Sequence, residues 1–205
     1  MTTSQPGLAD ACTPVRLGPG RRLLLALACL GAAGAQPICQ AAESEASEAA
    51  VQAAYLFNFA RFTEWPAGAF ANKSAALNYC QLGRRDALSN AMVTLSERPI
   101  QGHPLRVLQP EHLEDFRSCH LVFVADPDPR HRATILQALN AQPTLTVSDI
   151  EGFAREGGMI GLLRVGARLR FDINRTQTQK AGLRLAADLL NLASAIVETD
   201  NGASR

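Results

Sequence analysis

Two cysteines are the residues of this chain whose type and position point most directly to chemistry. Cys80 and Cys119 each lie in or at the start of a short apolar run that is typical of a strand. Thiols in an oxidising compartment tend to pair, and adjacent strands would bring these two together. Two separate buried thiols are the alternative. A bridge would enclose about 40 residues and contribute at most about 4 kcal/mol to stability.

Other nucleophiles lack the surroundings that catalysis needs. Ser148 follows an apolar run, but no glycines flank it as in the G-x-S-x-G turn of hydrolases. We expect Ser148 and Asp149 to form a turn or a cap. Cys119 and His120 are neighbours and would face opposite sides of a strand, so they cannot act as a nucleophile and its base there. We therefore expect no enzyme, although a hydrolase with a degenerate site remains an alternative.

Ligand and metal sites are equally weak in the sequence. Asp126 and Asp128 follow an apolar run, where open α/β sheets bind ligands, but the interleaved prolines favour a plain turn. No phosphate-binding glycine motif occurs, and Gly157-Gly158 is expected to form a tight loop or a strand entry. The four histidines are scattered and no C-x-x-C occurs, so we expect neither metal nor cofactor.

The N-terminus has the organisation of a signal peptide. Arg21 and Arg22 precede an apolar run at residues 23–30, which small residues follow up to Ala35. The run is too short to cross about 30 Å of hydrocarbon, which takes about 20 residues. A buried core helix and a lipoprotein signal at Cys29 or Cys39 are the alternatives. The prediction is export to the periplasm, with cleavage after Ala35 or close to residue 41.

Processing defines the mature domain. We expect residues 1–41 to be removed, residues 42–198 to form a single domain, and residues 199–205 to be a flexible tail. Cys39 remains only if the earlier cleavage site is used. Residues 42–205 contain 17 Lys and Arg against 18 Asp and Glu, a net charge of about −1. Such a balance excludes a basic field for nucleic acid, and 47% hydrophobic residues exclude general disorder.

A helix is predicted over residues 43–64, where Val51, Tyr55, Phe59 and Phe62 form one apolar stripe. Phe57 would point to the opposite face. Either the helix is covered on two sides, or one side contacts a partner. The partner alternative makes Phe57, Arg61 and Trp65 candidate contact residues.

The remaining pattern alternates strands and helices. Strands are predicted at 77–82, 104–108, 119–125 and 143–147, a hairpin at 158–163 and 167–173, and helices at 86–95, 130–140 and 177–197. The nearly continuous apolar run at 119–125 is typical of a central parallel strand. The predicted class is α/β: a three-layer sandwich with a largely parallel sheet, helices on both faces, and a C-terminal hairpin followed by a long helix.

Several segments together resemble the YfiR family. They are AAYLFNFARFTEWP at 53–66, CQLG at 80–83, CHLVFV at 119–124, LTVSD at 145–149 with Phe153 and GGMI at 157–160, and RFDIN at 170–174 with AGL at 181–183. Each segment alone is modest, but five in the same order are specific. The resemblance covers about residues 50–197, nearly all of the expected mature chain.

The resemblance implies a periplasmic regulator. Family members repress an inner-membrane diguanylate cyclase by binding its periplasmic sensor region, which lowers cyclic-di-GMP signalling and biofilm formation. An outer-membrane lipoprotein can sequester the repressor, and members tend to form homodimers. Members respond to redox state, and the bridge to carry over falls on Cys80 and Cys119. No cysteine follows Cys119, so a second bridge cannot operate. A periplasmic small-molecule sensor domain is the alternative.

Overall fold

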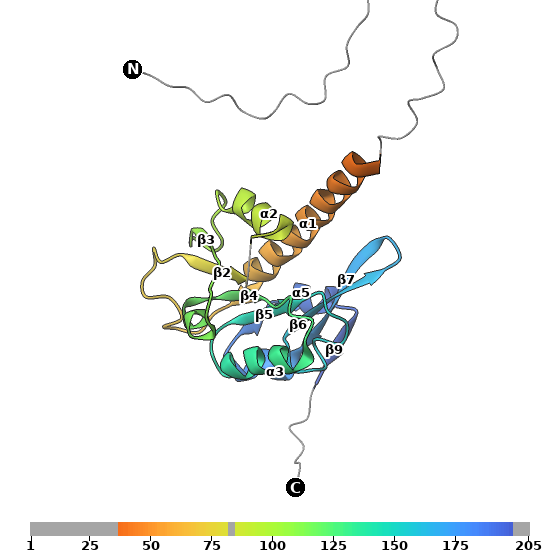
Figure 1. Cartoon of the computed structure of the whole chain (residues 1–205). Helices are drawn as coiled ribbons and strands as arrows, with labels where there is room; N and C mark the ends of the chain where they lie inside the picture. Colours follow the sequence, from red (N-terminus) through yellow and green to blue (C-terminus); the bar gives the residue numbers. More distant parts are fainter. Residues whose placement is uncertain (1–36, 82–84, 199–205) are drawn as a thin grey trace, which may run out of the picture. The chain divides into compact units, whose positions relative to one another are not determined.

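Seven strands form the central sheet, and five of them run in the same direction (Figure 1). The computed structural model describes residues 37–81 and 85–198, which from Cys39 onward belong to one compact unit. The strand order is β3-β2-β4-β5-β6-β7-β9. The strands are β2 Leu77–Gln81, β3 Leu105–Leu108, β4 Leu121–Phe123, β5 Leu145–Ser148, β6 Ile160–Val165, β7 Arg168–Asn174 and β9 Ala195–Val197.

Strands β2 to β6 are mutually parallel, whereas β7 pairs with β6 in the antiparallel sense and β9 runs parallel to β7. Tyr79 lies opposite Leu121, which lies opposite Leu145 on the next strand. This confirms the predicted α/β class with a largely parallel sheet. The predicted hairpin is also confirmed, with Gly166 at its turn in the left-handed region, φ 60°. The hairpin does not form the edge of the sheet, because β9 pairs with β7 beyond it.

Helices lie on both faces of the sheet. They are α1 Pro37–Arg61, α2 Ala87–Leu95, the 3-10 helix η1 Leu113–Ser118, α3 Pro129–Ala138, α4 Arg175–Lys180 and α5 Ala187–Leu192. A separate two-stranded sheet pairs β1 Thr63–Glu64 with β8 Arg184–Leu185. Two of the predicted helix starts are capped by aspartate: Asp86 accepts from the Ser89 amide before α2, and Asp128 accepts from the Arg130 amide before α3.

The sheet separates two hydrophobic clusters. One contains the inner faces of α1 and α2 with Tyr79 and Leu121, and the other contains Cys80, Val122 and Ile135 of α3. Neighbouring residues of one strand point to opposite clusters, as the pleat requires. In β4 both faces are buried, because no residue from Leu121 to Phe123 is more than 3% exposed. This burial confirms the prediction that the apolar run at 119–125 contains an interior strand.

The long helix predicted over residues 177–197 is wrong. Helix α4 ends at Lys180, and Gly182 at φ 71° reverses the chain while the Leu183 amide bonds the Thr178 carbonyl. Glycine adopts this conformation without the steric cost of a side chain, which makes it a common end of a helix. The chain then forms β8, α5 and β9. Its leucines and alanines are shared among these short elements rather than lying on one helical face.

The ends of the chain bear on the predicted domain limits. Residues 1–36, and with them most of the predicted signal peptide, lie outside the described residues, as does the predicted tail at 199–205. Residues 37–41 are the first residues of α1. No helix in the described part of the chain is long and apolar enough to cross a membrane. Cleavage near residue 41 stays a prediction.

Candidate functional site

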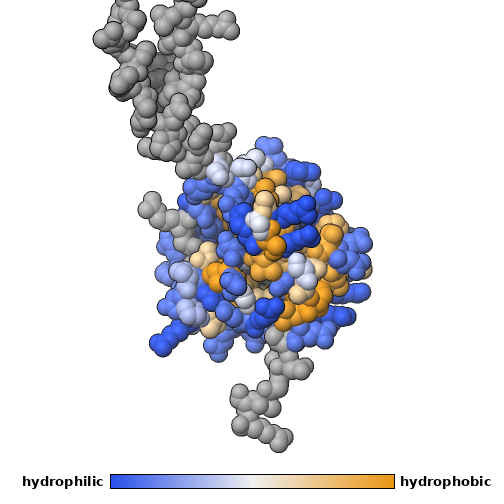
Figure 2. Space-filling view, turned by 90° about the vertical axis from the view of Figure 1, so that its right-hand side faces the viewer, coloured by the Kyte–Doolittle hydropathy of each residue, from blue (hydrophilic) through white to orange (hydrophobic). Residues whose placement is uncertain are grey.

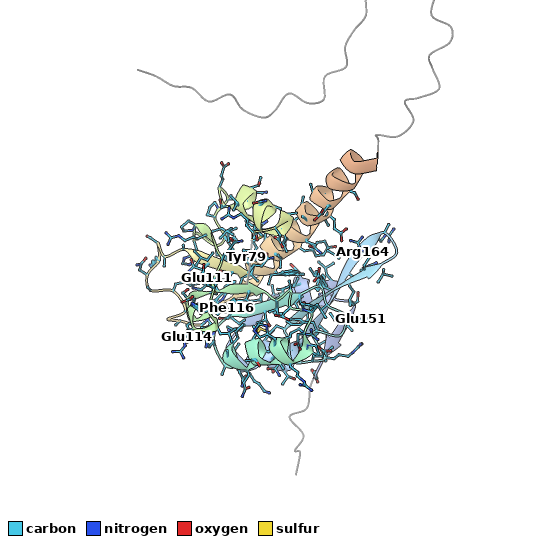
Figure 3. The ribbon with its side chains drawn as sticks, in the orientation of Figure 1. Tyr79, Glu111, Glu114, Phe116, Glu151 and Arg164 are labelled. Atoms are coloured by element: carbon cyan, nitrogen blue, oxygen red, sulfur yellow. A yellow bond between two sulfur atoms is a disulfide. The ribbon has the colours of Figure 1, made fainter. Side chains whose placement is uncertain are left out.

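Cys80 and Cys119 are joined by a disulfide that lies inside the domain. Cys80 is on β2 and Cys119 just precedes β4, the neighbouring strand, so their Cα atoms are 5.9 Å apart. The two residues are 0% and 3% exposed and pack in one cluster with Phe116 (labelled in Figure 3), Val122 and Phe153. The alternative of two separate buried thiols does not hold. The bridge ties two central strands together from the α3 side of the sheet.

This burial determines how the bridge can respond to redox state. Exchange with an external thiol requires access of the attacking thiolate to a sulfur atom. In the folded domain both sulfur atoms are covered, so reduction has to proceed through local opening of the strands or of η1. The bridge is therefore a structural staple whose loss changes the stability of the fold.

Gln81, the residue after Cys80, connects the end of β2 to α2. Its side-chain carbonyl accepts hydrogen bonds from the Tyr79 hydroxyl at 2.8 Å and from the Ser89 hydroxyl at 3.1 Å. Its amide donates to the Asp86 carboxylate at 2.5 Å. Burial raises the pKa of Tyr79 far above its ordinary value, so the hydroxyl remains a donor. This part of the family-like CQLG segment thus has a structural role.

An aromatic stack covers the other end of β2 and β4. The Phe70 ring lies between two imidazoles, with centroids 3.8 Å from His103 and 4.3 Å from His120 and nearly parallel planes. Trp65 meets both Phe70 and His120 edge-on. His120 directly follows Cys119, so the stack holds the segment after α1 against the strand that carries one end of the bridge. The sequence offered no periodic signal for it, because the rings come from three separate segments.

The hydrogen bonds of His120 define its protonation. Its Nδ1 accepts from the Asn78 amide at 3.1 Å, so its Nε2 carries the proton and donates to the Ala69 carbonyl at 3.1 Å. Burial lowers the pKa of His120 below its ordinary 6.5, the bond to Ala69 opposes this, and the charge of His103 adds to the lowering. Protonation would place a second donor against the Asn78 amide. The stack is therefore built for a neutral His120.

The three predicted contact residues have different environments. Phe57 is 5% exposed and packs in the cluster that includes α2, with the Arg98 guanidinium 5.6 Å from its ring centroid. Arg61 is exposed at the end of α1, and Trp65 is partly buried beside Phe70. The helix is thus covered on the Phe57 side by α2. Contact with a partner stays a prediction for the three residues, and the burial of Phe57 favours its role in the core.

The predicted apolar stripe of α1 is only partly buried: Phe59 is 1% exposed and Tyr55 packs against the core, whereas the other two residues are exposed. Val51 is 47% and Phe62 36% exposed, and both line an open groove of about 980 Å³ between α1, β7 and α5. Leu192 of α5, 65% exposed, lines the opposite wall. Figure 2 looks onto the side that carries β7 and shows a band of apolar surface there. We call the groove lined by Val51, Phe62 and Leu192 the α1–α5 groove.

An aromatic floor supports this groove. Tyr55, Phe59 and Phe171 meet edge-on, with centroids 5.0 to 6.2 Å apart. The Tyr55 hydroxyl donates to the Leu169 carbonyl at 2.9 Å. The charged residues that line the groove are both arginines, Arg168 and Arg170 of β7. Sequence reasoning missed the groove because its walls are more than 100 residues apart in the chain.

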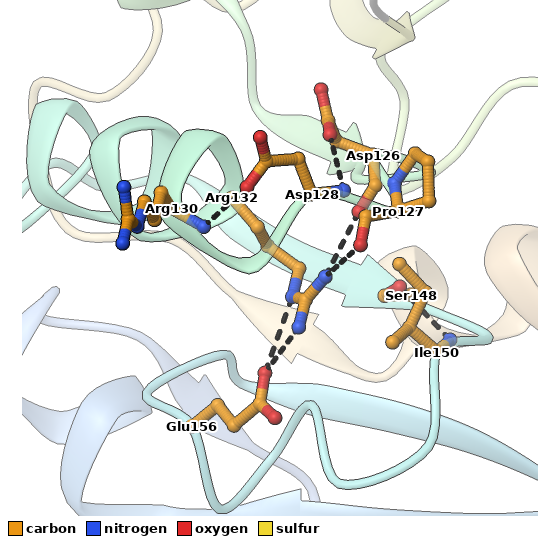
Figure 4. A network of polar contacts seen from close by, with 8 residues as sticks. All are labelled: Asp126, Pro127, Asp128, Arg130, Arg132, Ser148, Ile150 and Glu156. Atoms are coloured by element: carbon orange, nitrogen blue, oxygen red, sulfur yellow. Dashed lines mark hydrogen bonds and ion pairs between the residues drawn. The ribbon is translucent and has the colours of Figure 1, made fainter.

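The ends of the parallel strands hold a network of the protein's own side chains (Figure 4). Arg132, only 5% exposed, donates to Glu156 at 2.7 and 3.2 Å and to the Asp126 and Pro127 carbonyls at 3.0 and 3.4 Å. Ser148 is fully buried and accepts from the Ile150 amide, which confirms the predicted turn. The burial of Ser148 gives the hydrolase alternative no support, whereas a pocket of about 250 Å³ lined by Asp126 and Pro127 lies beside this network, at the end of β4. Among the residues described, no cluster of possible metal ligands occurs.

A family model described as YfiR/HmsC-like matches residues 49–194. The chain belongs to the YfiR/HmsC-like family. The match runs from α1 through α5, so it includes the disulfide, the aromatic stack and both walls of the groove.

Two solved structures are distantly similar to this chain. An ABC domain in complex with L-Trp from Streptococcus pneumonia is 12% identical, with a TM-score of 0.39, over 58% of this chain. A conserved domain protein from Vibrio cholerae O1 biovar El Tor is 12% identical, with a TM-score of 0.40, over 59% of this chain. The chain covers 55% of each of these two chains.

Proposed function

We propose that this protein is a periplasmic regulator that represses an inner-membrane diguanylate cyclase by binding the periplasmic sensor region of the cyclase. Repression lowers cyclic-di-GMP signalling and biofilm formation. The observation that carries the proposal is the family match over residues 49–194, since the YfiR-like family is regulatory rather than catalytic. The predicted signal peptide at residues 1–41 supports the location.

Two features of the mature protein extend this proposal. The buried bridge between Cys80 and Cys119 supports redox gating, because its loss would weaken the fold that presents the binding surface. Homodimerisation and sequestration by an outer-membrane lipoprotein are carried over from the family resemblance.

The test measures cyclic-di-GMP in cells that lack the gene. Deletion is expected to raise cyclic-di-GMP and surface attachment, and the full chain supplied in trans is expected to restore both. A matched control lacking residues 1–41 is expected to fail, because it stays in the cytoplasm. Unchanged cyclic-di-GMP after deletion, or full restoration by the cytoplasmic control, would overturn the proposal. Purified mature protein should also bind the purified periplasmic region of the cyclase.

A further inference from the structure

The segment between β1 and β2 is held to the sheet largely by side chains. Residues 65–76, the loop that leads into β2, contain no helix or strand, and we call them the strap (Figure 1). Backbone–backbone hydrogen bonds connect residues of the strap to one another, as from the Ala69 amide to the Pro66 carbonyl. Phe70 and Trp65 pack, partly buried, against the main hydrophobic cluster. Two histidines, which lie just before β3 and β4, also hold the strap.

The strap closes one end of the sheet. Four of its alanines line a pocket of about 250 Å³ at the starts of β2, β4 and β5, and Cys119 and His120 line the same pocket. Asn78 of β2 is a further lining residue, and its side-chain amide donates to the Ser118 carbonyl at 2.7 Å. The strap therefore covers the residues on both sides of Cys119, where the bridge joins β2 to the start of β4.

The two histidines differ in what a further proton would do. His103 donates from Nδ1 to the Ala75 carbonyl at 2.7 Å, since a carbonyl only accepts, and a charged His103 keeps this bond. His120 accepts at Nδ1 from the Asn78 amide, so a proton there leaves two N–H groups facing each other. A part-buried amide without an acceptor destabilises the closed arrangement. His120 is therefore the group whose charge can hold or release the strap.

The surroundings of His120 do not compensate a positive charge. His103 faces it across the Phe70 ring, Arg117 of η1 lines the same pocket, and Lys73 is the charged residue of the strap. All three are cations or become cations in acid, and none of the described residues that line the pocket is a carboxylate. Burial lowers the pKa of His120 below its ordinary 6.5, and the charge of His103 adds to the lowering, so the closed strap favours the neutral ring.

We propose that acidification releases the strap: His120 takes up a proton, ceases to accept from the Asn78 amide, and detaches residues 65–76 from the starts of β2 and β4. Histidine is the side chain whose ordinary titration falls between about pH 5 and 8, so release is expected in mildly acidic medium. Release uncovers the pocket and the chain on either side of Cys119 without breaking the bridge. This goes beyond the proposed function, because it makes the domain responsive to acid whichever partner it binds.

The test uses Trp65 as a reporter, because it is the only tryptophan of the chain and meets Phe70 and His120 edge-on. Acrylamide quenching of its emission is measured on the exported protein between about pH 7.5 and 5, with far-UV circular dichroism on the same samples. His120→Asn keeps a side-chain oxygen close to the position of Nδ1 but cannot take up a proton. His112→Asn makes the same substitution at an exposed histidine outside the strap and is the matched control.

Hydrogen exchange of the Asn78 amide follows the same opening at one atom. In the wild type its protection, corrected for the intrinsic exchange rate, should fall up to about tenfold per pH unit below about pH 6.5, because the open state binds the proton more tightly. Dilute urea should hardly change this exchange, since local release exposes little new surface. Quenching of Trp65 should rise over the same range while the circular dichroism stays native. His112→Asn should behave like the wild type, and His120→Asn should show neither change.

Three results would overturn the proposal. Equal pH dependence of Asn78 exchange in the wild type and in His120→Asn would assign the effect to another group. Constant quenching of Trp65 in the wild type would show that the strap stays closed. Exchange at Asn78 that rises with urea as steeply as exchange of the Asn174 amide on β7 would mean that acid unfolds the whole domain. If His120→Asn lacks a native circular dichroism spectrum at neutral pH, His120→Gln, which is equally unable to take up a proton, replaces it.

Discussion

Removal of the disulfide should destabilise the domain by an amount that its position in the chain determines. The bridge joins residues 39 apart, and loop-closure entropy for a loop of this size gives about 4 kcal/mol at 25 °C. For a domain of this length, each kcal/mol lowers the melting temperature by about 2 to 4 °C. We therefore expect Cys80→Ala/Cys119→Ala to melt about 8 to 16 °C below the oxidised wild type. The double substitution leaves no unpaired thiol at the site.

The assay is thermal unfolding followed by circular dichroism, with and without a strong reductant. Reductant should lower the melting temperature of the wild type toward that of the double variant and should leave the double variant unchanged. Reduction of the native protein should be slow at low temperature, because both sulfur-bearing residues are at most 3% exposed. Melting temperatures within about 2 °C for oxidised wild type and double variant would refute the reasoning.

Three further outcomes follow from buried groups. Burial lowers the pKa of His120, so the unfolded chain binds the proton more tightly than the folded chain. The free energy of unfolding should therefore fall as the pH drops through 6.5 and level off below the folded-state pKa, and urea titrations should show a shallower pH dependence for His120→Gln than for the wild type. Gly158→Ala should cost at least about 2 kcal/mol in urea, because its Cβ would lie 2.1 Å from the Phe153 ring, and wild-type stability would contradict this. Phe57→Ala should lower the free energy of unfolding by about 3 to 5 kcal/mol, whereas Arg61→Ala, at an exposed position, should change it by under about 0.5 kcal/mol. Partner binding per folded molecule, measured for both variants, would then separate a contact role from a core role.

The central strands could be predicted because each carries its own signal. The run around Leu121 is apolar on every residue, which a strand buried on both faces requires, and the aspartates at 86 and 128 mark two helix starts. The pairing of Cys80 with Cys119 followed from export and from the small number of cysteines left after processing. These features depend on local pattern or on a simple count.

The C-terminal third could not be predicted in the same way. Leucines and alanines from Leu183 to Val197 repeat with a helical period, but the conformation of Gly182 and the pairing of β8 and β9 with distant strands divide the segment. A single sequence does not reveal such tertiary pairing, because the energy comes from contacts with residues far away in the chain. The same holds for the α1–α5 groove. Periodicity placed Val51 and Phe59 on one stripe of α1, but tertiary contacts bury only Phe59, at 1% exposure against 47% for Val51.

The positions of the bridge and the groove determine how redox state can affect binding. The bridge joins β2 to the start of β4 on the α3 side, while the groove lies on the α1 side beside β7. Strands β5 and β6 separate β4 from β7 in the sheet. The strands that the bridge joins are therefore not direct neighbours of the groove walls, and loss of the bridge does not act on the walls directly. Redox gating has to act through the folded fraction, because about 4 kcal/mol is a large share of the stability of a small domain. A bound partner would favour the folded state and oppose this loss, so a repressor engaged with its partner should resist reduction better than the free protein.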